Sequence, residues 1–276
     1  IKEYCKKENI RIPDLVERFE GKGIWHYLDR VWIVMNSCIK RGLAAEGELP
    51  GGLGIMRKAY MLNNRRHMDE SPETRENRLV CAYAYAVSEE NASCGEIVTA
   101  PTCGACGVLP AVLRYTADRR GFSENEIRRA IATAGIIGNV IKTNASISGA
   151  ECGCQAEIGS ACSMASAALA ELYGMDTDQI EYAAEVAMEH HLGLTCDPIC
   201  GLVQIPCIER NAVAAKRAID SANLAHMLVG TRTISFDMVV RTMYETGVSM
   251  NRAFRETSEG GLAKLYSRRA GQTLGK

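Results

Sequence analysis

The chain has no hydrophobic run long enough to cross a bilayer. Its longest stretch without a charged residue runs from Ile97 to Leu113, is interrupted by proline and glycine, and falls short of the roughly 20 apolar residues that a spanning helix needs. An excess of charge is also lacking, since 32 Lys and Arg face 33 Asp and Glu. No overall field therefore favours nucleic acid or an anionic membrane as partner, and a small-molecule function is favoured.

Common catalytic and secretory signatures are absent as well. The chain has no Walker loop, no GxGxxG turn after a strand, no HExxH helix and no GxSxG elbow. No basic segment followed by an apolar segment opens it, so we expect a cytoplasmic protein. Alternating strand patterns and Asn-Gly or Asp-Gly hairpins are missing too, which argues against a β fold.

Helical periodicity is what the sequence offers instead. Apolar residues recur on one stripe from Trp25 to Ala45, with most charged residues off it. Ser123 and Glu126 form a capping box, which predicts a helix from there towards Val140. We therefore predict an all-α protein.

Two further helices are predicted from their end signals. Thr177 and Asp178 are suitable caps for a helix that follows them. A second helix is predicted over Ser235 to Thr246, and Gly247 is expected to end it.

Cysteine is unusually abundant. A disulfide framework would suit a short secreted chain, whereas this chain is long enough to form a core without one, so metal or cluster ligation is the better interpretation. Some of these residues must still be ordinary buried side chains, and we expect this of Cys5, Cys38, Cys81 and Cys94, which lie in segments with helical pattern. The twelve are Cys5, Cys38, Cys81, Cys94, Cys103, Cys106, Cys152, Cys154, Cys162, Cys196, Cys200 and Cys207.

Three segments rich in glycine and poor in charge separate the predicted helices. They are residues 99–107, 144–159 and 192–206, and each contains cysteine. Buried loops carry backbone polar groups that need partners, so we expect these segments to surround something polar. The pair Cys103 and Cys106 could be a redox pair or half of a zinc site, and the other close pairs are equally ambiguous by themselves.

The order of residues around the cysteines matches one enzyme family over nearly the whole chain after Leu49. The matching stretches are Ala100–Thr102, Gly107–Leu113, Asn144–Glu157, Met188–Pro198, Val203–Asn211, Met243–Gly247 and Arg255–Ala263. In these stretches the chain resembles the alpha chain of the iron–sulfur-dependent L-serine dehydratases.

The resemblance implies a [4Fe-4S] cluster held by Cys154, Cys196 and Cys207. Three protein ligands leave one iron open, and an open iron is a Lewis acid that can assist departure of a hydroxyl group. The implied reaction converts L-serine to pyruvate and ammonia without pyridoxal phosphate. Cys103, Cys152 and Cys200 stand where the family carries other residues, so a contribution from them or from Cys106 stays open.

The resemblance also implies a domain organisation and a partner. Residues 1–48 are predicted to be a helical lead, and residues 49–276 a helical catalytic domain with cysteine-bearing loops around the cluster. The Ser-His-Thr-Val-Gly-Pro motif that the family carries on its smaller domain or beta chain does not occur here. We therefore expect a beta chain as partner.

Candidates for the remaining chemistry are few. Asn144, Ser146 and Ser148 could bind the amino-acid substrate, although such residues often only cap or support loops. His190 matches a family histidine and could handle a proton, although a lone histidine is more often structural or solvated.

Three rival functions remain compatible with the sequence. The first is a cluster-dependent lyase for another amino acid, such as an L-cysteine desulfidase. The second is a non-enzymatic iron or redox sensor, and the third is an all-α zinc protein.

Overall fold

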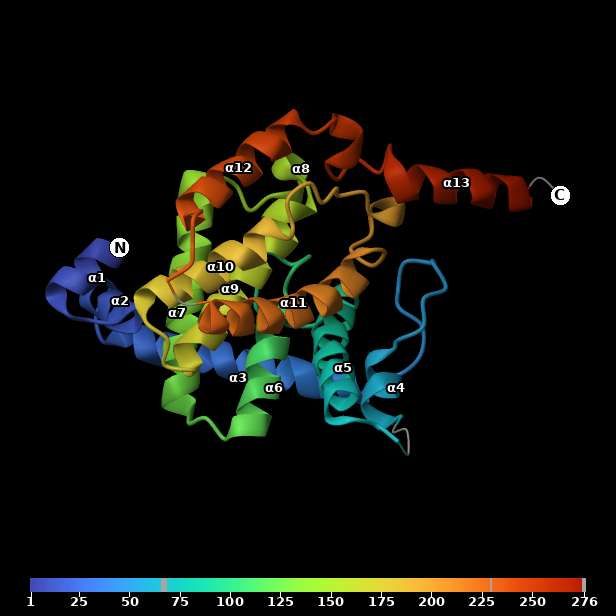
Figure 1. Ribbon diagram of the computed structural model, residues 1–276. Helices are drawn as coiled ribbons and strands as arrows, with labels where there is room; N and C mark the ends of the chain where they lie inside the picture. Colours follow the sequence, from blue (N-terminus) through green and yellow to red (C-terminus); the bar gives the residue numbers. More distant parts are fainter. Residues whose placement is uncertain (66–68, 229, 275–276) are drawn as a thin grey trace.

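The computed structural model describes residues 1–65, 69–228 and 230–274. Within these ranges the regular elements are helices, and β pairing is limited to two isolated bridges, so the all-α prediction is confirmed (Figure 1). None of the helices described is long and apolar enough to span a membrane. In chain order the helices are α1 (Lys2–Glu8), α2 (Ile12–Glu20), α3 (Gly23–Ala44), α4 (Ala59–Asn64), α5 (Pro72–Ala92), α6 (Val108–Arg120), α7 (Glu124–Asn144), α8 (Gly149–Cys152), the π-helix η1 (Gln155–Gly159), α9 (Ser160–Leu172), α10 (Thr177–Glu189), the 3₁₀-helix η2 (Ile199–Gly201), α11 (Cys207–Met227), α12 (Phe236–Ser249), the 3₁₀-helix η3 (Arg252–Phe254) and α13 (Gly261–Leu274).

Helix α9 forms the centre of the molecule. Every residue of α9 is buried, and the helix packs against α6, α7, α10 and α11. Its sequence is dominated by Ala, Ser and other small residues, which let the neighbouring helices approach closely. The hydroxyl of Ser163 donates to the carbonyl of Ala184 on α10 at 2.8 Å, so a polar side chain in this core has a partner. Since η1 runs directly into α9, the residues of η1 are fixed to the most buried element.

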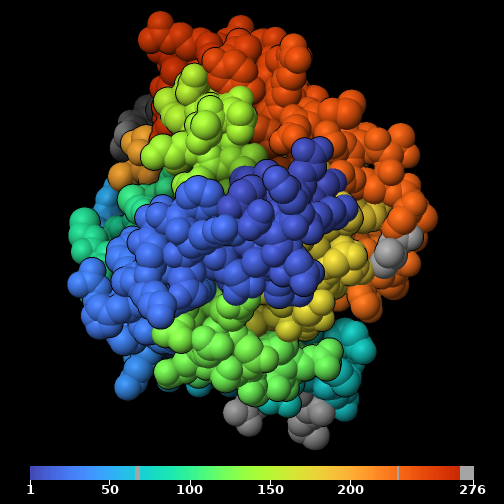
Figure 2. Space-filling model, turned by 90° about the vertical axis from the view of Figure 1, so that its left-hand side faces the viewer, coloured from blue at the N-terminus to red at the C-terminus, as the bar shows by residue number. Residues whose placement is uncertain are grey.

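The N-terminal helices cover one face of this core. Figure 2 shows α1 to α3, in blue, lying across the surface between segments of later helices. Leu15 and Val16 of α2 and Met35 of α3 are buried in the same cluster as the central helices. The predicted boundary between residues 48 and 49 remains a prediction.

Helix starts follow local sequence where a capping box is present. The predicted box of Ser123 and Glu126 is formed, with Ser123 N donating to Glu126 Oε2 at 2.8 Å. The caps predicted for α10 were wrong. Asp176 caps that helix by accepting from Gln179 N at 2.8 Å, because Asp176 and Gln179 have the spacing of a reciprocal box.

Gly247 does not end a helix, contrary to the prediction. Helix α12 continues through it to Ser249, and Gly247 is buried against α8. A Cβ atom at this position would lie 2.4 Å from Cβ of Cys152, far inside van der Waals contact. The glycine is therefore required by the close approach of two helices, which its local sequence does not reveal.

This contact gives a stability prediction. We expect Gly247→Ala to lower the free energy of unfolding by about 1–3 kcal/mol, because α12 and α8 must separate to admit a methyl group. Gly135→Ala is the matched control, since Gly135 is also inside a helix but a Cβ there would meet no atom within 4 Å. The control should stabilise the protein by up to about 1 kcal/mol. Urea denaturation measures both, and equal effects would contradict the assignment.

Candidate metal centre

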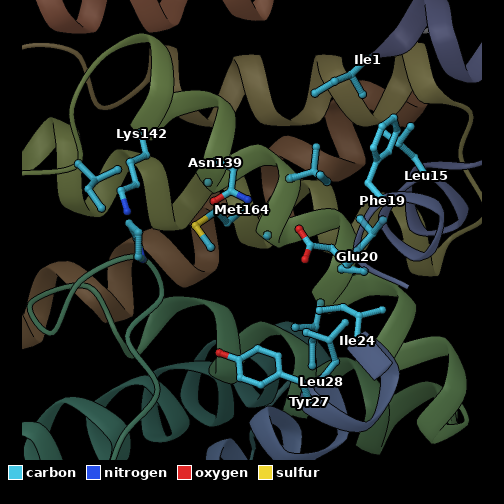
Figure 3. Close-up of a pocket in the computed structure, with 18 of the residues that line it drawn as sticks. Ile1, Leu15, Phe19, Glu20, Ile24, Tyr27, Leu28, Asn139, Lys142 and Met164 are labelled. Atoms are coloured by element: carbon cyan, nitrogen blue, oxygen red, sulfur yellow. The ribbon is translucent and has the colours of Figure 1, made fainter. Parts of the chain in front are cut away.

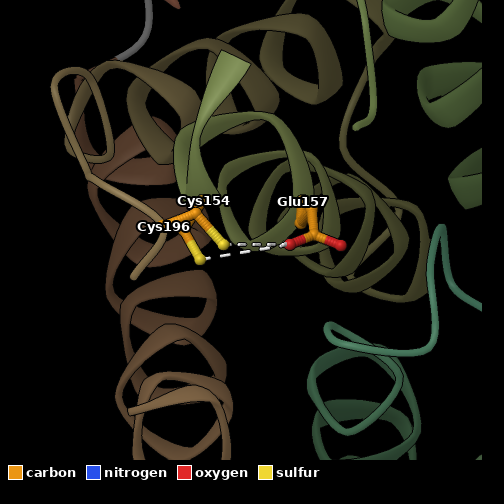
Figure 4. Close-up of side chains that lie close together, drawn as sticks. All are labelled: Cys154, Glu157 and Cys196. Carbon is orange, nitrogen blue, oxygen red and sulfur yellow. Dashed lines mark hydrogen bonds between the residues drawn. The ribbon is translucent and has the colours of Figure 1, made fainter. Parts of the chain in front are cut away.

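Two thiols and one carboxylate meet at the start of the central helix. Cys154 directly precedes η1, Glu157 lies within η1, and Cys196 lies in the loop between α10 and η2. The two sulfur atoms and a carboxylate oxygen of Glu157 all lie within 4.8 Å of one another. Each sulfur is 4.0 Å from Glu157 Oε2 (Figure 4). Both cysteines are only 2% exposed, so this is a buried group of donors.

Short contacts join the two loops that carry these cysteines. Gly153 has a left-handed φ of 74°, and a Cβ there would lie 2.7 Å from the Leu194 carbonyl oxygen. Gln155 N donates to the same carbonyl at 3.2 Å, and Gln155 Oε1 accepts from Gly193 N at 2.9 Å. The register of one loop against the other is therefore set next to Cys154.

Gly149 leaves room on one side of the donor group. A Cβ at Gly149 would lie 2.5 Å from Glu157 Oε2 and 3.2 Å from Cys196 Sγ. Any other residue would push a side chain into the space beside these atoms.

The C-terminal segment braces Cys196. Its N–H donates to the Phe254 carbonyl at 2.7 Å, and its carbonyl accepts from Glu256 N at 2.6 Å. The adjacent Asp197 accepts from Leu262 N at the start of α13. The position of the Cys196 loop therefore depends on Phe254, which lies 58 residues further along the chain (254 − 196).

Cys207 is the third predicted ligand and begins α11. It is 7% exposed and lies outside the 4.8 Å group. Burial, together with the charges of Cys154 and Glu157, raises the pKa of Cys207 to about 12. Cys207 is thus close enough to respond to the same charges, although the structure does not place it in the group.

The thiols and Glu157 influence one another's protonation. The hydrogen bond from the Cys196 thiol lowers the pKa of Cys154, and the positive charge of Arg210 adds to this effect. The same hydrogen bond to Cys154 raises the pKa of Cys196. Burial raises the pKa of Glu157, opposed by the hydroxyl of Thr102, which donates to Glu157 Oε1 at 2.9 Å.

Arg210 connects the segments around the donor group. It lies one turn after Cys207 on α11, donates to the Thr195 carbonyl oxygen, and places Nη2 3.9 Å from Asp197 Oδ1. A guanidinium here stabilises the charged form of Cys154, whose burial would otherwise be costly. The donor chemistry fits a thiolate-bound metal centre, because soft sulfur ligands suit iron–sulfur clusters and zinc.

The predicted substrate-binding residues lie in different surroundings. Ser146 is buried, donates to Glu151 Oε2 at 2.5 Å and accepts from Ser148 N at 3.1 Å. Ser148 is the N-cap residue of α8. Asn144 is exposed, donates to the Val140 carbonyl at 2.8 Å and faces a cavity that the metal-centre cysteines do not line. Substrate binding by Asn144, Ser146 and Ser148 stays a prediction.

His190 lies at the C-terminal end of α10 and is exposed. Its Nδ1 donates to the Val186 carbonyl at 2.8 Å, which leaves Nε2 without a partner in the described part of the chain. The neighbouring His191 is buried, and burial lowers its pKa. Proton handling by His190 stays a prediction.

The other cysteines divide by exposure. Cys5, Cys38 and Cys81 lie in helices as expected, whereas Cys94 follows the end of α5 and is exposed. Cys103 and Cys200 are exposed and Cys106, Cys152 and Cys162 are buried. In the residues described, none of these joins the 4.8 Å donor group.

Sequence reasoning gave too little weight to the polar residues of this site. Glu157, Thr102 and Arg210 all lie in the stretches that match the family, but none of them was predicted as a site residue. A usable signal was present for two of them, since Glu157 follows Cys154 by three residues and Arg210 follows Cys207 by three. That spacing puts both members of each pair on one helix face.

Known proteins match this chain closely. The serine dehydratase alpha chain family matches residues 6–263. An L-serine dehydratase of Streptomyces coelicolor is 50% identical over 234 residues, which cover 84% of this chain and 51% of the relative. L-serine dehydratase TdcG of Escherichia coli is 52% identical over 240 residues, covering 85% and 52%. An L-serine dehydratase of Helicobacter pylori is 43% identical over 274 residues, covering 95% and 60%. The chain thus spans only 51% to 60% of the length of these relatives.

The donor group predicts binding of a soft divalent metal ion by the metal-free chain. We expect Cd²⁺ to bind with thiolate absorption in the ultraviolet, and Glu157→Gln to weaken that binding about tenfold, because it removes a carboxylate that faces both sulfurs. Glu209→Gln is the control, since Glu209 is exposed on α11 and pairs with Lys58. Equal Cd²⁺ affinities for the two variants in an anaerobic titration would show that Glu157 takes no part.

Proposed function

The chain belongs to the serine dehydratase alpha chain family, and from this premise we propose that it is the cluster-bearing catalytic part of an L-serine ammonia-lyase. The reaction converts L-serine to pyruvate and ammonia. The observation that carries the proposal is the buried pair of Cys154 and Cys196, with Cys207 nearby, in a chain about half identical to L-serine dehydratases.

A [4Fe-4S] cluster is the cofactor that we propose for this site. Cys154, Cys196 and Cys207 would hold it, since all three thiols are buried and the charge of Arg210 acts on both Cys154 and Cys207. Cys154 and Cys196 also face the same carboxylate, that of Glu157. When bound through three protein ligands, such a cluster supplies an open iron that acts as a Lewis acid towards the hydroxyl of the substrate.

The chain itself contributes support and proton handling in this proposal. Glu157 is held by the Thr102 hydroxyl, and its raised pKa lets it keep a proton beside the thiols more readily than a solvated carboxyl does. We assign substrate binding to Asn144, Ser146 and Ser148. His190 is the proposed proton handler, because its Nδ1 bond to a carbonyl fixes the tautomer in which Nε2 is the acceptor.

A second chain or domain completes the proposed enzyme. The match to this chain leaves 40% of the Helicobacter pylori relative uncovered (100 − 60) and 49% of the Streptomyces coelicolor relative uncovered (100 − 51). We propose that a beta chain of L-serine dehydratase supplies a wall that keeps bulk water from the reacting substrate and helps to position it.

Cysteine variants test the cluster assignment. We expect Cys154→Ser, Cys196→Ser and Cys207→Ser each to remove most of the iron and sulfide after anaerobic reconstitution, because each loses a thiolate ligand. Cys162→Ser and Cys94→Ser serve as a buried and an exposed control, and both should retain the visible absorption of the wild-type chain. A requirement for Cys103 and Cys106, with Cys154 dispensable, would show that the assigned ligands are wrong.

Turnover tests the reaction and the partner separately. Under anaerobic conditions the reconstituted chain with its beta chain should deaminate L-serine without pyridoxal phosphate, lose activity in air, and regain it with ferrous iron and a thiol. The chain alone should be about 100-fold slower, since an incomplete site positions the substrate poorly. Oxygen-insensitive turnover blocked by a carbonyl reagent, or a preference for L-cysteine, would contradict the assigned reaction. Full activity of the chain alone would contradict only the partner requirement.

A further inference from the structure

A cavity of about 750 Å³ lies between the N-terminal helices and α7 (Figure 3). Helices α2 and α3 form one wall, α7 forms another, and Thr99 and Pro101 close one side. None of the metal-centre cysteines lines it. Its volume is within the range of cavities that bind small organic molecules.

Four of the polar side chains that line this cavity are exposed and have no protein partner among the residues that the structure describes. In Figure 3 the carboxylate of Glu20, the hydroxyl of Tyr27 and the amide of Asn139 point into the cavity, and Lys142 lies on the side away from Glu20. Within the part of the chain that the structure describes, these four side chains make no hydrogen bond or ion pair.

Charged side chains on the same helices behave differently. Arg128 of α7 pairs with Asp29 of α3 at 3.0 Å, and Arg129 of α7 pairs with Asp14 of α2 at 2.8 Å. The helices therefore do pair their charges where these can reach one another. Around the cavity, opposite charges are instead held apart across an open space.

Gly135 supports the view that this space is maintained. It lies inside α7 and lines the cavity, and a Cβ there would meet no atom within 4 Å. Packing therefore does not require a glycine, which costs about 1 kcal/mol relative to alanine inside a helix. Gly138, one turn further on, is different, because a Cβ there would lie 2.9 Å from the sulfur of Met164.

The lining indicates the kind of ligand. A cation and an anion on different sides match a molecule that carries both charges, and the amide and hydroxyl groups can bond to either end. The buried floor, which includes Leu15, Ile131 and Met164, is apolar and suits a hydrocarbon side chain.

We propose that this cavity binds a free α-amino acid with an apolar side chain, its carboxylate on Lys142 and its ammonium group on Glu20. No metal-centre cysteine lines the site, although Ile147, which lies between Ser146 and Ser148, does. The proposal does not depend on the proposed reaction. It shares a loop with that centre, because Pro101 lines the cavity and the next residue, Thr102, donates to Glu157. A bound amino acid therefore rests on the loop that supports Glu157.

Calorimetry of the metal-free full chain with L-leucine tests the proposal. We expect binding at millimolar or lower L-leucine, and about fivefold weaker binding of leucinol, which lacks the carboxylate, and of 4-methylpentanoate, which lacks the ammonium group. Lys142→Met should weaken L-leucine about fivefold but leave leucinol unchanged. Lys40→Met, which alters an exposed lysine of α3 outside the cavity, should bind like the wild type.

Gly135→Leu provides a steric test, because its side chain would occupy the cavity. Binding should be lost while the helical circular dichroism and unfolding midpoint stay close to those of the wild type. If this variant fails to fold, Lys142→Met and the two analogues decide the matter by themselves. No heat of binding at about 10 mM L-leucine, equal affinity for leucinol, or unchanged binding by a folded Gly135→Leu would each overturn the proposal. The metal centre takes no part in this measurement, so the proposed lyase function would stand in any of these cases.

Discussion

The candidate metal centre depends on one buried side chain that joins two loops. Gln155 is fully buried, and its amide accepts from Gly193 N and donates to the Cys152 carbonyl, while its backbone N–H donates to Leu194. An amide has both donor and acceptor capacity, so it can satisfy both loops at once. Because Cys154 and Cys196 lie beside these bonds, the side chain and backbone of Gln155 hold the two cysteine-bearing loops in register.

Charge compensation is the second constraint on the site. Thiolates and a carboxylate crowded in a buried region repel one another unless cations or donors lie close by. Arg210 and Thr102 fulfil this need from α11 and from the loop before α6. The site therefore draws on elements far apart in sequence, and its electrostatics are a property of the fold as a whole.

Local signals predicted the helices well and their contacts poorly. The periodic stripe after Trp25 and the capping box at Ser123 are visible in a few adjacent residues, and both were confirmed. The prediction for Gly247 was wrong because the glycine is required by close contact with Cys152, which lies 95 residues earlier (247 − 152). The same limit applies to the site. The family resemblance singled out Cys154 and Cys196, whereas the hydrogen bond from Thr102 to Glu157 exists only once distant loops are packed together.

Helix α13 extends away from the helical body in Figure 1. Its second residue, Leu262, nevertheless donates to Asp197, which is next to Cys196 of the metal centre. Its 14 residues make an arm about 21 Å long, which is held at its base by the bond from Leu262 N to Asp197. Because the helix is about 21 Å long, a rotation of about 10° about its base would move its far end by about 4 Å. Asp197 sits at the pivot and would hardly move. With this geometry, a displacement of about 4 Å at the far end of α13 corresponds to a much smaller displacement at the loop of Cys196.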